Sequence, residues 1–207
     1  FNYRPEKNYK KLFNWTIKNP KLFWTSIWEF SDIKGIKNDK FHFPKEIIKS
    51  KFLVKSKLNY AENLLSKSDN TKAITFISES GYREEKSWRE LNNITFKLIK
   101  FFKDNKIKEN DRIAAYTANQ IETVESFIAT SAIGAIWSSC SPDFGTQGVI
   151  ERFSQIKPKL LIITDRYYYN GKEINVLERL PVILKKIKSI KSVLILNYPG
   201  KKNLKQK

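Results

Sequence analysis

Residues that could do chemistry gather between Cys140 and Lys172. Cys140, the sole cysteine, is a candidate nucleophile, and Asp143 is a candidate acid or base. No basic partner for Cys140 is evident nearby in the sequence, so a small buried thiol is the favoured interpretation. Asp143 follows Pro142 just before a helical pattern, where a carboxylate forms a turn or caps the helix. Neither residue therefore indicates a catalytic site.

Two further candidates are set aside on residue type and spacing. The GTQG sequence at 145–148 lacks the glycine density and the terminal lysine of a phosphate-binding loop, so it is interpreted as a helix start. His42, the sole histidine, has no partner at metal-ligand spacing, and no metal site is predicted. What remains is the polar, aromatic sequence YYYNGK at 167–172, which is interpreted as a loop.

The elements that position this loop alternate regularly from residue 112 onward. Apolar strands are predicted at 112–116, 135–138, 160–164 and 193–196, separated by helices at 120–133, 147–156 and 176–188. Pro181 marks either a kink in the last helix or its start. Such alternation implies right-handed crossovers, so the predicted fold class is α/β, a parallel sheet with flanking helices.

Ligands of parallel sheets bind beyond the carboxyl ends of the strands. In this sequence those ends fall at 117–119, 138–144 and 165–172. Any chemistry that reaches the chain should therefore touch these three loops.

The sequence before residue 112 is organised differently. Strands are predicted at 73–77 and 82–86, joined by a hairpin turn, and Ser87 and Glu90 have the spacing of a capping box for the next helix. That helix should end near Asn105, with Asn105 as a left-handed cap. The predicted domains are an aromatic-rich N-terminal extension at 1–70 that packs on the main domain, an incomplete α/β domain at 71–197, and a linker or disordered end at 198–207.

Composition limits the classes of function. Hydrophobic residues make up 41% of the chain and aromatic residues 14%, enough to fill a core. The net charge of +18 comes almost entirely from lysine, and an arginine-poor basic surface is a weak signature of nucleic-acid binding. A lysine-rich solvated surface is thus favoured over a nucleic-acid partner, although a basic module for polyanions stays an alternative.

The cysteine count and the ends of the chain carry further expectations. A single cysteine allows no intrachain disulfide and fits a reducing, cytoplasmic location. No apolar run approaches the ~20 residues of a membrane helix, so membrane insertion is not expected. The chain begins with Phe1 and contains no methionine, so we expect a segment of a longer protein.

The stretch from Ser87 to Ser139 resembles the start of the large domain in acyl-adenylate-forming (AMP-binding) enzymes. The sequences of these enzymes commonly contain the motif tWxEL followed by the motif GVxxGDRVA. The matching residues are Trp88, Glu90, Leu91, Asp111, Arg112 and Ala114, followed by Asn119 and Glu122. Asn105 and Asn110 replace two glycines of the family pattern, and asparagine tolerates left-handed backbone best after glycine, so both turns should survive.

More specific blocks resemble one subfamily, the acetoacetate–CoA ligases. These blocks are LNYAENLL at 58–65, SPDFG at 141–145, ERFSQIKPK at 151–159 and DRYYYNGK at 165–172, together with the tryptophan-rich start at 14–30. The resemblance covers residues 10–197 in order. An acetyl- or propionyl-CoA synthetase type, acting on another short acyl acid, remains an alternative because the acyl pocket of the family lies mostly downstream.

The resemblance implies a parent enzyme that uses ATP, Mg²⁺ and coenzyme A to convert acetoacetate to acetoacetyl-CoA through an acyl-adenylate. The family's phosphate loop and mobile C-terminal domain have no match here. The segment is therefore expected to be inactive alone, to depend on the remainder of the same polypeptide, and to hold no catalytic residue.

Coenzyme A is the one ligand for which the resemblance implies contacts in this segment. In related acetyl-CoA synthetases the loop that matches Tyr169 to Lys172 approaches the phosphates of coenzyme A. The implied contacts are Asn170, Gly171 and Lys172, because glycine permits close backbone approach and lysine supplies charge. Tyr169 stands where the family has a basic residue.

Overall fold

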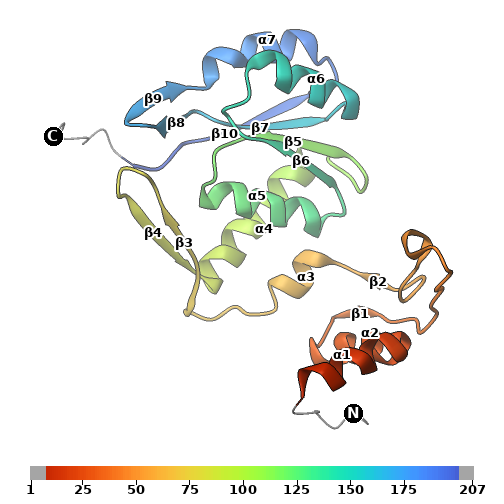
Figure 1. Ribbon diagram of the computed structural model, residues 1–207. Helices are drawn as coiled ribbons and strands as arrows, with labels where there is room; N and C mark the ends of the chain where they lie inside the picture. Colours follow the sequence, from red (N-terminus) through yellow and green to blue (C-terminus); the bar gives the residue numbers. More distant parts are fainter. Residues whose placement is uncertain (1–7, 201–207) are drawn as a thin grey trace. The chain divides into compact units, whose positions relative to one another are not determined.

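A computed structural model describes residues 8–200 and divides the chain into two compact units, Phe1–Asn63 and Leu64–Lys207 (Figure 1). Of the segment 198–207, predicted as a linker or disordered end, residues 201–207 lie outside the described residues. Tyr198, in contrast, is buried, and its amide donates a hydrogen bond of 2.7 Å to Asp165.

The first unit is built from short helices and aromatic contacts. Its elements are α1 (Tyr9–Lys18), α2 (Pro20–Phe30), β1 (Gly35–Ile36), a 3₁₀ turn (Ile47–Lys49), β2 (Lys57–Leu58) and α3 (Tyr60–Leu64). Pro20 occupies the first turn of α2, as its fixed φ predicts. Trp24 packs edge-on against Phe52 at 5.0 Å between ring centroids. Leu58 belongs to β2, which pairs with β1.

The second unit begins with an antiparallel hairpin of β3 (Lys72–Ile77) and β4 (Arg83–Ser87), followed by α4 (Trp88–Asp104). The predicted capping box is confirmed. The Glu90 amide donates to Ser87 Oγ at 3.3 Å, and the Ser87 amide donates to Glu90 Oε2 at 2.8 Å. These two bonds satisfy amides that the first turn of a helix leaves without partners.

The end of α4 differs from the prediction. Asn105 has a φ of −81°, and the left-handed residue is the next one, Lys106, with a φ of 59°. The Asn105 side chain donates to the Phe101 carbonyl at 2.9 Å and accepts from Ser192 Oγ at 2.7 Å. Asn105 is therefore held in a right-handed conformation by its side chain. The second predicted turn is confirmed, since Asn110 has a φ of 65°.

The centre of this unit is a four-stranded parallel sheet in the order β10-β7-β5-β6, which confirms the α/β fold class. The strands are β5 (Arg112–Tyr116), β6 (Ile136–Cys140), β7 (Leu160–Thr164) and β10 (Ser192–Leu196), and the helices are α5 (Ile121–Ala132), α6 (Thr146–Ile156) and α7 (Leu180–Lys186). Pro181 lies in the first turn of α7, so it starts this helix rather than kinking it.

Helices cover both faces of the sheet, with α6 and α7 on one face and α4 and α5 on the other (Figure 1). Residues of β7 alternate between two cores. Leu161 and Ile163 pack with Phe153 of α6, and Leu160 and Ile162 pack with Phe102 of α4. Burial on both faces explains why this strand reads as an unbroken apolar run. Within residues 8–200, no helix combines the length and the apolar character needed to cross a bilayer.

A buried ionic cluster joins the hairpin to α5. Lys86 of β4 donates to Glu125 at 2.9 Å, and Glu122 and Glu84 lie 3.7 and 3.8 Å from the same ammonium. The Glu125 side chain is fully buried, and its Oε2 has no hydrogen-bond partner. Burial raises the pKa of Glu125, and the other two carboxylates raise it further against the opposing effect of Lys86.

The segment predicted as a loop at 167–172 is instead a second hairpin. Strand β8 (Arg166–Tyr169) pairs antiparallel with β9 (Lys172–Asn175), and Asn170 and Gly171 form the two-residue turn. Both turn residues have positive φ, 50° and 70°. Asn-Gly is the sequence that a two-residue hairpin turn of this type favours. The loop interpretation was therefore wrong.

Candidate functional site: the carboxyl edge of the sheet

Three segments leave the carboxyl ends of neighbouring strands and meet at one edge of the sheet. The loop 117–119 follows β5, the turn 141–145 follows β6, and Asp165 with the β8–β9 hairpin follows β7. The tip of the β3–β4 hairpin reaches the same edge. This is the place where the sequence predicts ligand contacts.

A pocket of about 310 Å³ lies between these segments, and we call it the tyrosine pocket. Its walls come from the tips of both hairpins, the two loops and Tyr198. The lining residues are Phe76, Ile77, Ser78, Glu79, Ala118, Asn119, Ser141, Pro142, Asp143, Tyr167, Tyr168, Tyr169 and Tyr198. Aromatic rings dominate the wall, and Tyr198 contacts both Phe76 and Tyr168, with ring centroids 6.0 and 5.9 Å apart.

The electrostatics of the tyrosine pocket favour a neutral or cationic group. Glu79 and Asp143 contribute carboxylates, while the described lining includes no lysine or arginine. Burial and a hydrogen bond to Asp143 raise the pKa of Tyr167 to about 12. Tyr167 is therefore a neutral phenol near pH 7. An anionic phosphate would meet negative charge in this pocket despite the basic character of the whole chain.

The two residues first considered for catalysis are Asp143, in the turn 141–145, and Cys140, the last residue of β6. Ser141 Oγ donates to Asp143 at 2.8 Å and accepts the Asp143 amide at 3.3 Å, so the predicted turn-forming role is confirmed. The predicted helix-capping role is wrong, because Gly145 occupies the N-cap of α6 without a side-chain bond. Cys140 is buried and free, and burial raises the pKa of its thiol, which disfavours the thiolate.

Arg179, which lies 35 positions after Phe144 in the sequence, holds this turn in place. Its guanidinium donates to the carbonyls of Pro142 and Phe144, at 2.7 and 3.1 Å, and also bonds to the Tyr116 hydroxyl. Tyr116, which is fully buried, donates to the same two carbonyls at 3.1 and 2.6 Å. One guanidinium nitrogen of Arg179 and the buried phenol of Tyr116 thus hold the wall of the tyrosine pocket in place.

Replacing Arg179 with methionine should loosen this wall, because the carbonyls of Pro142 and Phe144 lose the guanidinium nitrogen that donates to both of them. We expect a loss of about 1–3 kcal/mol in the free energy of unfolding and faster amide exchange at 143–145. The matched control is Arg152→Met, since Arg152 stacks on the Phe144 ring, 4.2 Å from its centroid, and the bonds to the Pro142 and Phe144 carbonyls come from Arg179 instead. Urea unfolding and hydrogen exchange of both variants provide the measurement. Equal rates of amide hydrogen exchange at 143–145 in the two variants would contradict the role of Arg179 in holding the turn.

The predicted coenzyme A contacts lie beside the tyrosine pocket rather than in it. Asn170 and Gly171 form the tip of the β8–β9 hairpin, and Lys172 is the first residue of β9 and is exposed. The amides of Asn170 and Gly171 donate to the two carboxylate oxygens of Glu79, at 3.1 and 2.9 Å. The turn amides therefore already hold an anionic group.

Asp165 organises this hairpin, and its place directly after a predicted strand was its one signal at the level of sequence. Its Oδ1 accepts the amides of Arg166 and Tyr198, both at 2.7 Å, and its Oδ2 accepts the Arg166 guanidinium at 2.7 Å. Its carbonyl accepts the Val176 amide at 2.9 Å, where β9 ends. The partners lie up to 33 positions away, a separation that local patterns cannot reveal.

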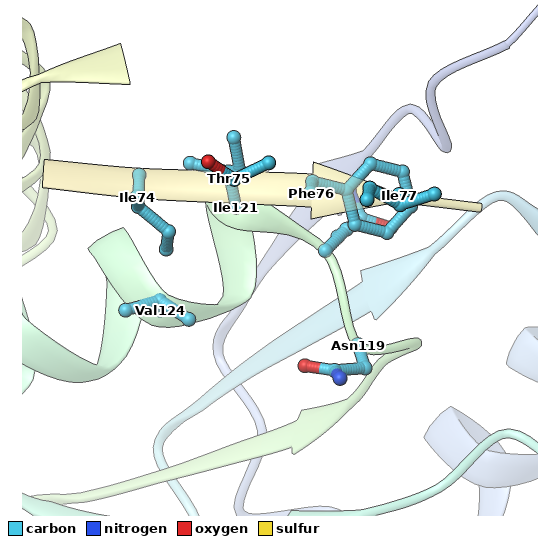
Figure 2. A pocket seen from close by; sticks show the side chains of 8 residues that line it. Ile74, Thr75, Phe76, Ile77, Asn119, Ile121 and Val124 are labelled. Carbon is cyan, nitrogen blue, oxygen red and sulfur yellow. The ribbon is translucent and has the colours of Figure 1, made fainter. Parts of the chain in front are cut away.

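A second pocket, of about 290 Å³, adjoins the first and shares Phe76, Ile77 and Asn119 with it. Figure 2 shows Ile74 of β3 above Val124 of α5, with Asn119 on the loop after β5. The hairpin side and the helix side of this pocket are largely apolar.

The parallel sheet, its helical layers and a pocket beyond the strand ends define a ligand-binding α/β domain. Residues 63–206 match the AMP-binding enzyme family, and the chain belongs to this family. The match covers the sheet, both hairpins and the tyrosine pocket.

Several curated relatives with similar sequences are named acetoacetyl-CoA synthetase, and one that is 28% identical is named malonamoyl-CoA synthetase. The chain is 36% identical to an acetoacetyl-coenzyme A synthetase of Rhizobium meliloti (strain 1021) over 87% of its length, and 36% identical to an acetoacetyl-CoA synthetase of Gallus gallus over 92%. A solved acetoacetyl-CoA synthetase from Streptomyces lividans superposes with a TM-score of 0.85 over 97% of the chain at 25% identity. The chain spans only 28%, 29% and 32% of these three proteins, respectively.

Proposed function

We propose that the chain is the N-terminal segment of an acetoacetate–CoA ligase, and that its part in the reaction is to hold coenzyme A. The main support is the continuous match to acetoacetyl-CoA synthetases over about nine-tenths of the chain. In the proposed reaction the carboxylate of acetoacetate attacks the α-phosphorus of ATP, and pyrophosphate leaves. The thiol of coenzyme A then attacks the acyl carbon and displaces AMP.

The described residues do not fit ATP and Mg²⁺. The GTQG sequence starts α6 with Gly145 as N-cap, and it supplies no lysine for a phosphate. We therefore assign adenylation to the remainder of the polypeptide and derive no step of it here. The segment alone should not form an adenylate. A cytoplasmic location, with small-molecule substrates as the partners, belongs to the same proposal.

The β8–β9 turn does fit the phosphates of coenzyme A. Its two amides donate hydrogen bonds to an anionic group in the structure, and the exposed Lys172 follows directly. We place the phosphates at this turn rather than in the tyrosine pocket, because the Asp143 carboxylate would repel them in the pocket. The aromatic walls of that pocket suit the neutral parts of the ligand instead.

A titration of the ¹⁵N-labelled chain with coenzyme A tests this assignment. The largest amide shifts should fall at 117–119, 141–145 and 169–172. Lys172→Gln should weaken binding about fivefold, the size of one exposed charge pair. The control Lys103→Gln removes the same charge from an exposed position on α4 and should leave the dissociation constant unchanged. Equal affinity in the two variants, or shifts scattered over the lysines, would favour the polyanion-binding alternative.

A further inference from the structure

The contact between Glu79 and the 170–171 turn joins the tips of two hairpins that are 91 positions apart in sequence (Figure 1). Each carboxylate oxygen accepts one turn amide, Oε2 from Asn170 at 3.1 Å and Oε1 from Gly171 at 2.9 Å. Two successive residues with positive φ direct neighbouring amides toward one acceptor, a geometry that binds anions. Glu79 thus occupies this small anion receptor as an internal ligand.

The β3–β4 turn holds Glu79 in position. Ser78 is buried. Its hydroxyl forms a hydrogen bond of 2.7 Å with Ser80 Oγ and accepts a hydrogen bond of 3.2 Å from the Tyr82 amide. The Ser78 amide also donates to the Tyr82 carbonyl, at 2.9 Å. The backbone beneath Glu79 is therefore fixed, while its side chain is exposed and can leave the amides by rotating into water.

We propose that Glu79 is an autoinhibitory latch, and that an external phosphate binds the Asn170 and Gly171 amides only after the Glu79 carboxylate has left them. The inference rests on the proposed function, because it concerns the turn assigned to the phosphates of coenzyme A. A phosphate and a carboxylate require the same two donors, so their binding is mutually exclusive. The apparent affinity for the phosphate is then reduced by the fraction of molecules whose latch is closed.

The latch also determines one wall of the tyrosine pocket. Glu79 lines that pocket together with Tyr169, the residue that precedes the turn. When Glu79 rotates away from the amides, its charge leaves the place where the phosphate enters. Binding of the anion at the turn is in this way coupled to a change in the adjoining pocket.

The test uses inorganic pyrophosphate as the anion and the ¹⁵N-labelled chain as it stands. Glu79→Gln should bind pyrophosphate about five- to tenfold more tightly than the wild type, with shifts centred on Asn170 and Gly171, because the competing carboxylate is gone. Without pyrophosphate, the same two amides should exchange their protons faster in the variant. Glu79→Asp keeps the charge but shortens the reach, and it should show the same faster exchange.

The control is Glu85→Gln, which removes the same charge from the same hairpin at an exposed residue paired with Arg83 and Lys72. If Glu85→Gln strengthens pyrophosphate binding as much as Glu79→Gln does, net charge alone explains the effect and the latch is refuted. Unchanged exchange at the turn amides in Glu79→Gln would refute it as well.

A titration of both proteins with coenzyme A distinguishes a failure of the latch from a failure of the proposed function. If Glu79→Gln gains pyrophosphate affinity at the turn while neither protein binds coenzyme A, the latch stands and the proposed function fails. If coenzyme A shifts the turn amides equally in wild type and variant, the proposed function stands and the latch fails.

Discussion

Replacing Lys86 with methionine should lower the free energy of unfolding by about 3–5 kcal/mol at pH 7, because it leaves the Glu125 carboxylate buried without its cation. The side chain of Lys86 is only 16% exposed and that of Glu125 is 0% exposed, so water cannot replace the lost partner. Urea unfolding followed by circular dichroism measures the loss. Lys100→Met is the matched control, because Lys100 pairs with Asp104 at 2.8 Å on the exposed surface of α4, and it should cost less than about 1 kcal/mol.

The effect of Lys86→Met should depend on pH in a defined direction. Burial raises the pKa of Glu125 in the folded state, so the protonated form is favoured there and folding loses stability as the pH rises and the group ionises. Near pH 4 the Glu125 carboxyl takes up a proton in both the folded and the unfolded chain, so the free energy of unfolding of the variant should approach that of the wild type. Toward pH 7 the free energy of unfolding of the variant should fall below that of the wild type. A constant difference across this range, or a loss as small as that of Lys100→Met, would contradict the buried-cluster assignment.

Phe153→Ala should cost about 3–5 kcal/mol, because it empties a fully buried site between α6 and the sheet. Phe153 packs in the same core as Leu161 and Ile163 of β7, and both of these side chains are also fully buried. Urea unfolding of the variant provides the measurement.

The matched control is Phe96→Ala on α4, whose ring is 61% exposed and which should change stability by less than about 1 kcal/mol. Equal losses for Phe153→Ala and Phe96→Ala would mean that α6 does not pack on the sheet as described. Both variants remove the same ring from a helix, so helix propensity does not confuse the comparison.

Local and periodic signals predicted much of the fold. The capping box of Ser87 and Glu90 spans a single helical turn, so its partners are visible in sequence. The strand Leu160–Thr164 is buried on both faces and gives an unbroken apolar run that needs no partner to be recognised. The parallel order of the strands followed from the alternation of strands and helices, since such connections are right-handed.

Two errors came from reading residue type without its surroundings. Asn170-Gly171 after three tyrosines, which favour strands, is a strong hairpin signal, yet the polar, aromatic sequence was interpreted as a loop. Asn105 was expected to adopt the left-handed conformation, but Ser192 engages its side chain and Lys106 takes that conformation instead. The partner of Asn105 lies 87 positions away and enters only with the tertiary structure.

The candidate site was predicted in place but not in detail. The rule that ligands bind beyond the carboxyl ends of strands pointed to three segments, and in the structure these segments meet around a pocket. It could not show that Arg179 holds the carbonyls of Pro142 and Phe144, or that Glu79 occupies the 170–171 turn. These contacts join positions 35 to 92 residues apart, and no periodicity or local motif encodes them.

We propose that this chain is the N-terminal segment of an acetoacetate–CoA ligase. An assay of the protein encoded by the complete reading frame tests this proposal most directly. With ATP, Mg²⁺ and coenzyme A, acetoacetate should drive formation of AMP, pyrophosphate and acetoacetyl-CoA, and should do so faster than acetate or propionate. Preference for acetate or propionate would assign the chain to the other short-chain ligases. No acid-dependent AMP formation with any of the three acids would contradict the account.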